Sequence, residues 1–553
     1  MRAEADITYK QNQHRRIKML KNAIVVMFDS LQFNYLGCYG NEWIKTPNMD
    51  RLAREGVLFE NCYTENLPTV PCRRSMHTGR YGLPFNGWSP LTMEDTTIAD
   101  LCWGRPIDTA LIFDCPMYRQ PKFGYTRGFD KVYFTHGHEM DHYYYETDPL
   151  FHLDPNDYIS DSVREGAGKQ FGQGIIDAQI DEIKSYLKQR QYWKSPDDRY
   201  VAKTMKQAVK YLEQIDRNKQ FYLWIDSFDP HEPWDPPSVY MKTPCPYDPD
   251  WAGKQDFMPF VGDVEGLYSD EILHHIRMLY AELVTLCDTW LGYLMDAMRR
   301  LGLEENTLLY MVSDHGEPLG KGADGHGIMR KVRPWPYEEL VHTPMIMRFP
   351  GCPAGKRVKA FVQSCDVAPT VCDWLGIGVH PSMDGKSLLP LALGEADSIR
   401  DYAIAGYYGA SWAIFTEKWS FIHWTKNDRN AMSFTKHFNE ELARSSEYLK
   451  VAGGKGADRF TENVPTDTLE ERDVTPDSST AYARHKAAAT TDGEQQWTCT
   501  PGSTMSVPEL DELYDRVNDP FQLNNIIVQY PGVAEDLFAK LMDIINSLVA
   551  KRG

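Results

Sequence analysis

Four short apolar segments in this chain each end at polar or acidic side chains. They cover residues 22–28, 109–113, 221–225 and 307–312, and are followed respectively by Asp29-Ser30, Asp114, Asp226 and Ser313-Asp314-His315. Short segments rich in branched apolar residues are typical of buried parallel strands. Ligand sites of such sheets lie at the carboxyl ends of the strands. The pattern therefore predicts a parallel sheet with its functional residues along one edge.

Helical patterns separate these strands, for example at residues 48–55, 200–215 and 271–301. Alternating strands and helices predict an α/β fold with a large, mostly parallel central sheet flanked by helices, followed by a smaller C-terminal α+β subdomain. We expect an N-terminal extension at 1–21, a main α/β domain at 22–395 and a C-terminal subdomain at 396–553. The subdomain includes a polar insertion at about 427–505, which is rich in Gly, Ala, Thr and Asp.

Charge and composition narrow the range of partners. The formal net charge is −19, which argues against nucleic acid because phosphate backbones require clustered Lys and Arg. The N-terminal residues form no apolar run of signal-peptide length, and no segment is long and apolar enough for a membrane span. The 11 cysteines show no paired spacing and are expected to be free thiols. We expect a cytoplasmic protein with no membrane partner, and the sequence is compatible with a homo-oligomer.

Two further segments carry polar groups in a particular order. Residues 68–80 read Pro-Thr-Val-Pro-Cys-Arg-Arg-Ser-Met-His-Thr-Gly-Arg, and residues 227–234 read Ser-Phe-Asp-Pro-His-Glu-Pro-Trp. Taken alone, Asp29 would most simply cap a helix, and His231 would be an ordinary hydrogen-bonded side chain. Their occurrence with the pair Asp314-His315 favours a shared site.

The segment at 68–80 resembles the signature of the sulfatase branch of the alkaline-phosphatase superfamily. In that signature a Cys or Ser, the precursor of formylglycine, precedes x-Pro-x-Arg and a later Thr-Gly-Arg. Alignment on Pro71, Arg73 and residues 78–80 places Thr69 at the nucleophile position. The alternative nucleophile, Cys72, would put both Pro71 and Arg73 out of place.

The resemblance implies a set of site residues. One divalent metal ion would be held by Asp29, Ser30, Thr69, Asp314 and His315. Oxygen ligands with one imidazole favour Mn²⁺ or Zn²⁺, with Ca²⁺ or Mg²⁺ as alternatives. Catalysis would use Thr69, Arg73, His231 and Lys331, with His326 and Arg333 as further substrate-binding candidates. The family spacing reaches Lys331 when counted from His326 and Arg333 when counted back from Tyr337. A second metal would require Asp229, His231, Asp324 and His326, and we expect only one.

Two departures from the family pattern bear on the substrate. Thr69 cannot become formylglycine because its Cβ carries a methyl group. A phosphorylated threonine is a normal intermediate among the phosphatases, nucleotide pyrophosphatases and phosphoethanolamine transferases of the superfamily. Many sulfatases have Gly-Lys-x-His where residues 113–116 read Phe-Asp-Cys-Pro. We therefore predict a hydrolase of a small anionic ester, near the phosphonate monoester hydrolases and phosphodiesterases. The alternatives are a sulfatase with an unmodified threonine and an inactive binding protein.

Overall fold

A computed structural model describes residues 20–119, 123–138, 141, 148–331, 335–408, 410–424 and 510–552. Its centre is an eight-stranded sheet in the order β11-β2-β10-β7-β1-β5-β3-β4. The strands are β1 (Asn22–Phe28), β2 (Val57–Tyr63), β3 (Ile107–Phe113), β4 (Lys131–Phe134), β5 (Gln220–Ser227), β7 (Thr307–Ser313), β10 (Met345–Arg348) and β11 (Lys356–Gln363). Every pairing in this sheet is parallel except the two made by β10. The predicted α/β class is confirmed.

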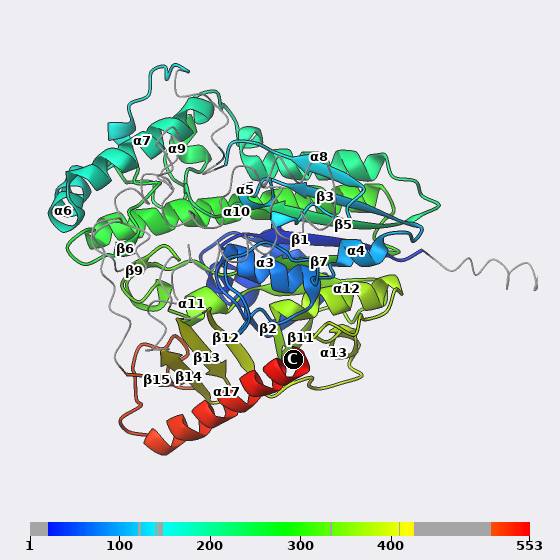
Figure 1. Ribbon diagram of the computed structural model, residues 1–553. Helices are drawn as coiled ribbons and strands as arrows, with labels where there is room; N and C mark the ends of the chain where they lie inside the picture. The colour runs from blue at the N-terminus through cyan, green and yellow to red at the C-terminus, as the bar shows by residue number, and fades with distance from the viewer. Residues whose placement is uncertain are drawn as a thin grey trace, which may run out of the picture.

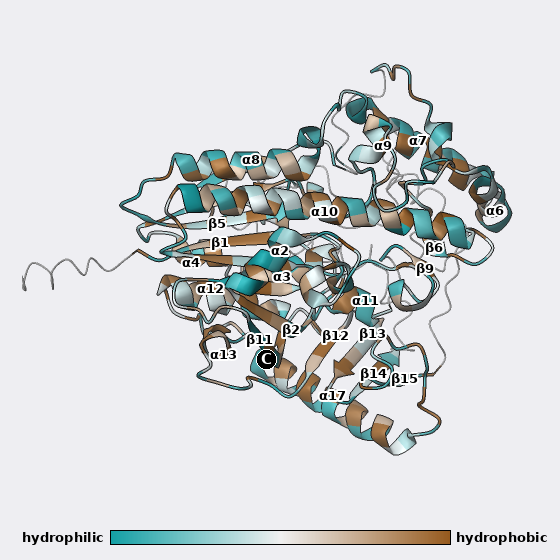
Figure 2. Cartoon of the chain, turned by 180° about the vertical axis from the view of Figure 1, so that it is seen from behind, coloured by the Kyte–Doolittle hydropathy of each residue, from teal (hydrophilic) through white to brown (hydrophobic). Residues whose placement is uncertain are grey.

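Strand β1 shows why the central strands are almost wholly apolar. Its even-numbered side chains from Ile24 to Phe28 pack in a core with α8 (Tyr200–Glu213) and α10 (Asp270–Arg300). Its odd-numbered side chains from Ala23 to Met27 pack on the other face with α3 (Thr69–Thr78) and α12 (Val367–Leu375). Both faces are therefore buried, and Figure 2 shows the apolar strands between helices with polar outer surfaces.

The C-terminal part forms a second, antiparallel sheet of β12 (Ala403–Tyr407), β13 (Ser411–Phe415), β14 (Trp419–Trp424) and β15 (Glu512–Asp515). Helix α17 (Pro531–Arg552) packs on it through Leu537, Leu541 and Ile545 (Figure 1). This is the smaller α+β subdomain that was predicted. The insertion expected at 427–505 and nearly all of the extension expected at 1–21 lie outside the described residues.

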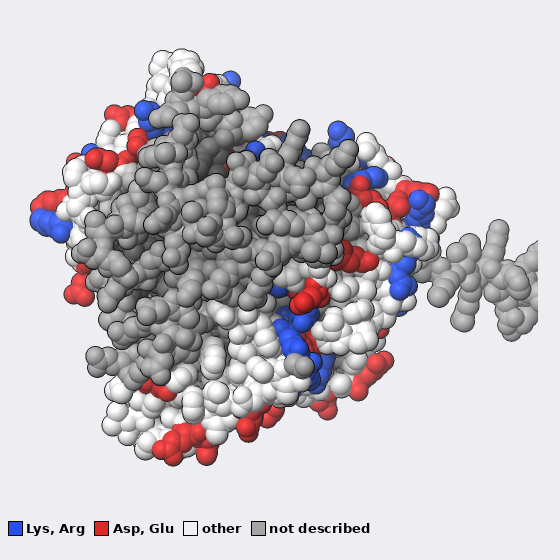
Figure 3. All heavy atoms as spheres, viewed as in Figure 1, with Lys and Arg blue, Asp and Glu red and all other residues white. Residues whose placement is uncertain are grey.

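The remaining elements lie around the main sheet. A small sheet is formed by β6 (Gly262–Asp263), β8 (Leu319–Gly320) and β9 (Ile328–Met329), and β9 ends just before Lys331 in the chain. The other α-helices of the described residues are α2 (Pro47–Glu55), α4 (Ile98–Cys102), α5 (Pro116–Arg119), α6 (Asp161–Phe171), α7 (Gln173–Arg190), α9 (Pro237–Met241), α11 (Glu338–Val341) and α13 (Leu389–Leu393). No helix within the described ranges is long and apolar enough to cross a membrane. Acidic and basic side chains are interspersed over the described part of the face in Figure 3.

Candidate metal and ester-hydrolysis site

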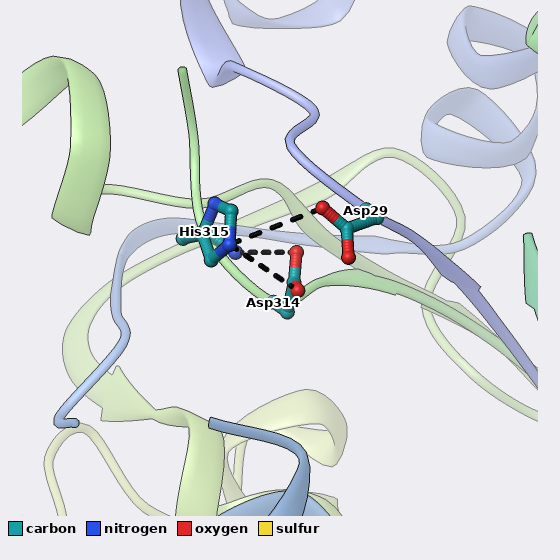
Figure 4. A group of neighbouring side chains, drawn as sticks. All are labelled: Asp29, Asp314 and His315. Atoms are coloured by element: carbon teal, nitrogen blue, oxygen red, sulfur yellow. Dashed lines mark hydrogen bonds and ion pairs between the residues drawn. The ribbon is translucent and has the colours of Figure 1, made fainter. Parts of the chain in front are cut away.

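The site begins where β1 and β7 end side by side. These strands pair in parallel with Phe28 opposite Ser313, so the residues that follow, Asp29 and Asp314, are brought together. The backbone N–H of Ser30 donates to Asp314 Oδ1 at 3.0 Å. Asp29, Asp314 and His315 each offer one ligand atom, and these atoms lie within 4.8 Å of one another (Figure 4). The three side chains are fully buried, which few charged groups tolerate without a counter-charge.

The two carboxylates have opposite pKa directions. Burial and the neighbouring charge of Asp29 raise the pKa of Asp314 well above its ordinary value. Burial alone would raise the pKa of Asp29 too, but Lys331 and Arg73 lower it well below its ordinary value. A divalent cation would relieve the repulsion between the pair, and two carboxylates with an imidazole are a suitable donor set. The residues therefore fit the metal ion that the family resemblance implies.

His315 is held in the form that can bind a metal. Its Nδ1 is 2.7 Å from the Gly316 carbonyl, which directs Nε2 towards Asp314 Oδ2 at 3.4 Å and Asp29 Oδ1 at 3.9 Å. Burial lowers the pKa of His315 to about 3, so the imidazole is neutral at physiological pH. A Cβ on Gly316 would lie 1.9 Å from the Glu339 carbonyl oxygen, so only glycine permits this backbone path.

Thr69 is the first residue of α3, and its hydroxyl faces the cluster. Oγ1 lies 3.2 Å from His315 Nε2, and the residue is 2% exposed. A helix N-terminus favours negative charge on such an oxygen. Cys72 instead points into the scaffold, with Sγ 3.0 Å from the Asp314 carbonyl, and burial raises the pKa of its thiol well above the ordinary value. The geometry thus places the threonine, not the cysteine, beside the candidate ligands.

Arg73 forms ion pairs with the carboxylates of Asp29 and Asp314 and with a third carboxylate. Its Nη1 donates to Asp29 Oδ2 at 2.9 Å and to Asp314 Oδ2 at 2.5 Å. Its Nε and Nη2 form a bidentate pair with Asp226, at 3.0 and 2.8 Å. Asp226 had not been assigned a role from the sequence, although it too ends an apolar strand. The same Nη1 lies 3.4 Å from the Thr69 carbonyl, so the contact of Arg73 with Thr69 is with the backbone of the threonine.

Lys331 and Ser30 complete the inner site. Lys331 Nζ lies 2.9 Å from Ser30 Oγ, 3.5 Å from Asp29 Oδ1 and 3.6 Å from Glu317 Oε2. Burial opposes the charge of Lys331, but Asp29 and Glu317 raise its pKa above the ordinary value. Ser30 Oγ also donates to Asp29 Oδ1 at 2.8 Å. Glu317 was not expected here, although it follows His315 by only two residues.

His231 lies on the neighbouring loop after β5. Its Nδ1 is 2.7 Å from the Glu232 carbonyl, and its ring stacks on Phe228 at 4.0 Å between centroids. Burial lowers the pKa of His231 to about 3, although Glu232 acts in the opposite direction. With Nδ1 held by a carbonyl, Nε2 is the nitrogen left for a ligand.

The two further substrate-binding candidates are His326, which the structure describes, and Arg333, which it does not. Both ring nitrogens of His326 are engaged, Nδ1 with Glu339 Oε1 at 2.8 Å and Nε2 with the Gln522 carbonyl at 2.9 Å. The structure therefore places His326 in a contact between the lysine-bearing segment and the C-terminal subdomain. Arg333 lies outside the described residues, while Lys331 is the cation seen beside Asp29.

Comparison with known proteins identifies clear relatives. A family model described as Sulfatase matches residues 21–377, and one described as N-sulphoglucosamine sulphohydrolase, C-terminal, matches residues 325–442. An arylsulfatase of Clostridium perfringens is 27% identical over 406 residues, covering 69% of this chain and 81% of that protein. The multifunctional alkaline phosphatase superfamily protein PehA of Trinickia caryophylli is 25% identical over 427 residues, covering 69% and 79%. The phosphonate monoester hydrolase of Agrobacterium radiobacter shares the fold, with a TM-score of 0.60 at 17% identity over 96% of each chain.

Proposed function

This chain belongs to the sulfatase family of ester hydrolases, and we propose that it cleaves phosphodiesters or phosphonate monoesters with the Thr69 hydroxyl as its nucleophile. The observation that carries the proposal is the position of Thr69 Oγ1, 3.2 Å from His315 Nε2 beside the buried carboxylates of Asp29 and Asp314. A nucleophile is expected at this position, and threonine cannot be converted to formylglycine.

The threonine favours phosphorus over sulfur for a chemical reason. The second hydroxyl of a formylglycine hydrate lets a sulfated intermediate collapse by elimination, and threonine has no such group. A phosphothreonine, in contrast, can be opened directly by water at phosphorus.

The local charge favours a substrate group with a single negative charge. The Asp114 carboxylate, in the segment where many sulfatases have lysine and histidine, is bound by Thr204 Oγ1 at 2.8 Å and by the Phe228 N–H. Arg73 is committed to three carboxylates. Among the described residues around the cluster, this leaves Lys331 as the cation nearest an incoming anion.

Different side chains of the protein carry out the parts of a two-step displacement at phosphorus. Asp29, Asp314 and His315, with Ser30 beside them, would hold the divalent cation, which when bound supplies charge stabilisation for the oxygens at phosphorus. Thr69 Oγ1 releases its proton to solvent and forms the new P–O bond as the bond to the leaving oxygen breaks. In the second step a water oxygen forms a bond to phosphorus, the bond to Thr69 breaks, and Thr69 Oγ1 takes a proton back from solvent.

Lys331 binds the anionic group of the substrate, and His231 transfers protons. Lys331 Nζ neutralises a non-bridging oxygen. His231 Nε2 gives a proton to the leaving oxygen and takes one from the attacking water. Burial keeps His231 neutral in the free protein, and a bound anion would raise its pKa towards the range in which it can donate.

Sulfuric ester hydrolysis through the unmodified threonine is the second candidate. The observation that favours it is the relationship to the arylsulfatase of Clostridium perfringens.

One panel of matched esters separates the two. Turnover of 4-nitrophenyl sulfate, phosphate, a phosphodiester and a phenylphosphonate would be measured with the Mn²⁺-loaded protein, beside Thr69→Ala and Thr69→Ser. We expect the diester or phosphonate to be the fastest substrate, Thr69→Ala to abolish turnover, and Thr69→Ser to retain part of it. The proposal would be overturned if 4-nitrophenyl sulfate were the fastest substrate, or if Thr69→Ala kept full activity.

A further inference from the structure

The loop that carries Lys331 is anchored at three points to the C-terminal subdomain. It leaves β9 at Met329 and re-enters regular structure at Glu338, the first residue of α11. The structure describes it up to Lys331 and again from residue 335. Each of its described flanks is bound by a side chain or carbonyl that comes from a distant part of the chain.

Gln522 supplies two of the anchors. Its side-chain Oε1 accepts from the Glu338 N–H at 2.8 Å, and its backbone carbonyl lies 2.9 Å from His326 Nε2. Its Nε2 donates to Ser420 Oγ on β14 at 2.8 Å, so the same side chain is fixed to the second sheet. Gln522 is 1% exposed and has φ of 58°, a backbone conformation that non-glycine residues seldom adopt. A buried residue held in this conformation implies that its surroundings determine it strongly.

Tyr407, at the end of β12, supplies the third anchor at the lysine itself. Its hydroxyl donates to the backbone carbonyl of Lys331, and the tyrosine is 3% exposed. The carbonyl of Lys331 is thus fixed by the second sheet, while its ammonium group points to Asp29 and Ser30 of the first.

We propose that Tyr407 and Gln522 of the C-terminal subdomain are positioning residues that hold Lys331 at the anion-binding site, an inference that rests on the proposed function of Lys331. The anchors hold the Lys331 carbonyl, the Glu338 N–H and the His326 imidazole, so the chain is fixed at residue 331 and on both sides of it. A lysine side chain has several rotatable bonds, so its ammonium group stays beside Asp29 only if its backbone is fixed. The second sheet is therefore part of the active site although it supplies no group to the chemistry.

The test uses inorganic phosphate as the probe. Its affinity for the full-length Mn²⁺-loaded protein would be measured by calorimetry for the wild type, Tyr407→Phe, Lys331→Met and the double variant. Removing the hydroxyl leaves a buried carbonyl without its donor, and we expect Tyr407→Phe to weaken phosphate binding by about tenfold. In the Lys331→Met background the same change should have no further effect, because the two residues act through one group. Turnover with the preferred ester should show the same pattern, and the Mn²⁺ affinity of Tyr407→Phe should equal that of the wild type.

Tyr240→Phe is the matched control. Its hydroxyl also donates to a backbone carbonyl, that of Ser195 at 3.2 Å, and the residue is 7% exposed. This variant should bind phosphate as the wild type does. Gln522→Met, which has a similar shape but lacks both amide contacts, should reproduce the defect of Tyr407→Phe.

The outcomes separate the inference from the function on which it rests. Equal phosphate affinity in the wild type and Tyr407→Phe, or additive losses in the double variant, would overturn the positioning role. Weakened phosphate binding in Tyr407→Phe without turnover of any phosphorus ester would leave the positioning role standing and refute the proposed reaction. If Lys331→Met binds phosphate as tightly as the wild type, Lys331 does not bind the anion. That result would refute both the proposed role of Lys331 and the positioning role of Tyr407 and Gln522.

Discussion

Asp226→Asn tests whether Arg73 and a metal ion compete for the same carboxylates. In the wild type two nitrogens of the Arg73 guanidinium donate to Asp226, and the third nitrogen donates to Asp29 and Asp314. The asparagine keeps the shape of the side chain but removes one of the three negative charges around Arg73. We expect Arg73 then to depend more strongly on the two candidate metal ligands, so that an incoming cation must displace a tighter ion pair.

The magnitude follows from the geometry. All four side chains are fully buried, so solvent screens their charges weakly. Breaking a buried pair costs about 3–5 kcal/mol when the remaining charge has no partner. Arg73 keeps two partners, so we place the loss of stability below that range. Residues that support metal ligands typically change metal affinity about 10- to 100-fold when mutated, and we expect a loss of this size for Mn²⁺.

The assay is a calorimetric titration of Mn²⁺ into the metal-free protein, with unfolding in urea measured in parallel. Asp95→Asn is the matched control, because Asp95 forms a two-point ion pair with the adjacent Arg74 of the same helix, at 3.3 and 2.7 Å. That pair is buried but does not touch the metal ligands. If Asp226→Asn binds Mn²⁺ as tightly as Asp95→Asn and the wild type, Arg73 does not compete with the ion and the reasoning is refuted.

Three further changes have defined outcomes. Cys72→Ser should retain turnover, because the thiol faces a backbone carbonyl and the serine hydroxyl can make the same contact; loss of activity measured with the preferred ester would restore the cysteine as a candidate nucleophile. Gly316→Ala should destabilise the protein by about 1–3 kcal/mol and weaken Mn²⁺ binding, because its Cβ would meet the Glu339 carbonyl and displace His315; unchanged unfolding in urea would contradict this. Burial raises the pKa of Glu65 to about 7, so the folded protein binds a proton there that the unfolded chain releases near its ordinary value of 4.5. The stability of the wild type relative to Glu65→Gln should therefore fall by roughly 3 kcal/mol as the pH rises from 4.5 to above 7, and a constant difference in urea unfolding would refute the shift.

The sequence predicted the structure best where apolar segments form parallel strands of the main sheet. Apolar segments ending in Asp29 and Asp314 are parallel strands, and parallel neighbours bring their carboxyl ends together, so the proximity of these two carboxylates could be predicted from strand ends. Their role as metal ligands was implied by the family resemblance. The antiparallel direction of β10 could not be predicted, because an isolated apolar segment carries no information about its direction.

Side-chain partners that are distant in sequence were not predictable. Asp226 follows an apolar sequence segment as Asp29 does, yet its pairing with Arg73 depends on how helix α3 lies across the sheet edge. His326 was assigned to substrate binding by the family resemblance, whereas its partner Gln522 lies 196 residues later in the chain. Spacing predicts which residues share a loop but not which way each side chain turns.

The energetics of the cluster explain why such a site persists in a buried position. Asp29, Asp314, Asp226 and Arg73 have no exposed side-chain surface, and Lys331 has 6%. Removing these charges from water costs several kcal/mol for each ion, and their mutual attraction recovers that cost only with good geometry. An apolar core of the same volume would serve stability at least as well. The carboxylates of Asp29 and Asp314 lie close together, and the repulsion between them, which contributes to the raised pKa of Asp314, is what a divalent ion would relieve. This repulsion is therefore the source of the cluster's affinity for a cation, and it is the reason that changes in Asp226 should appear first in metal binding.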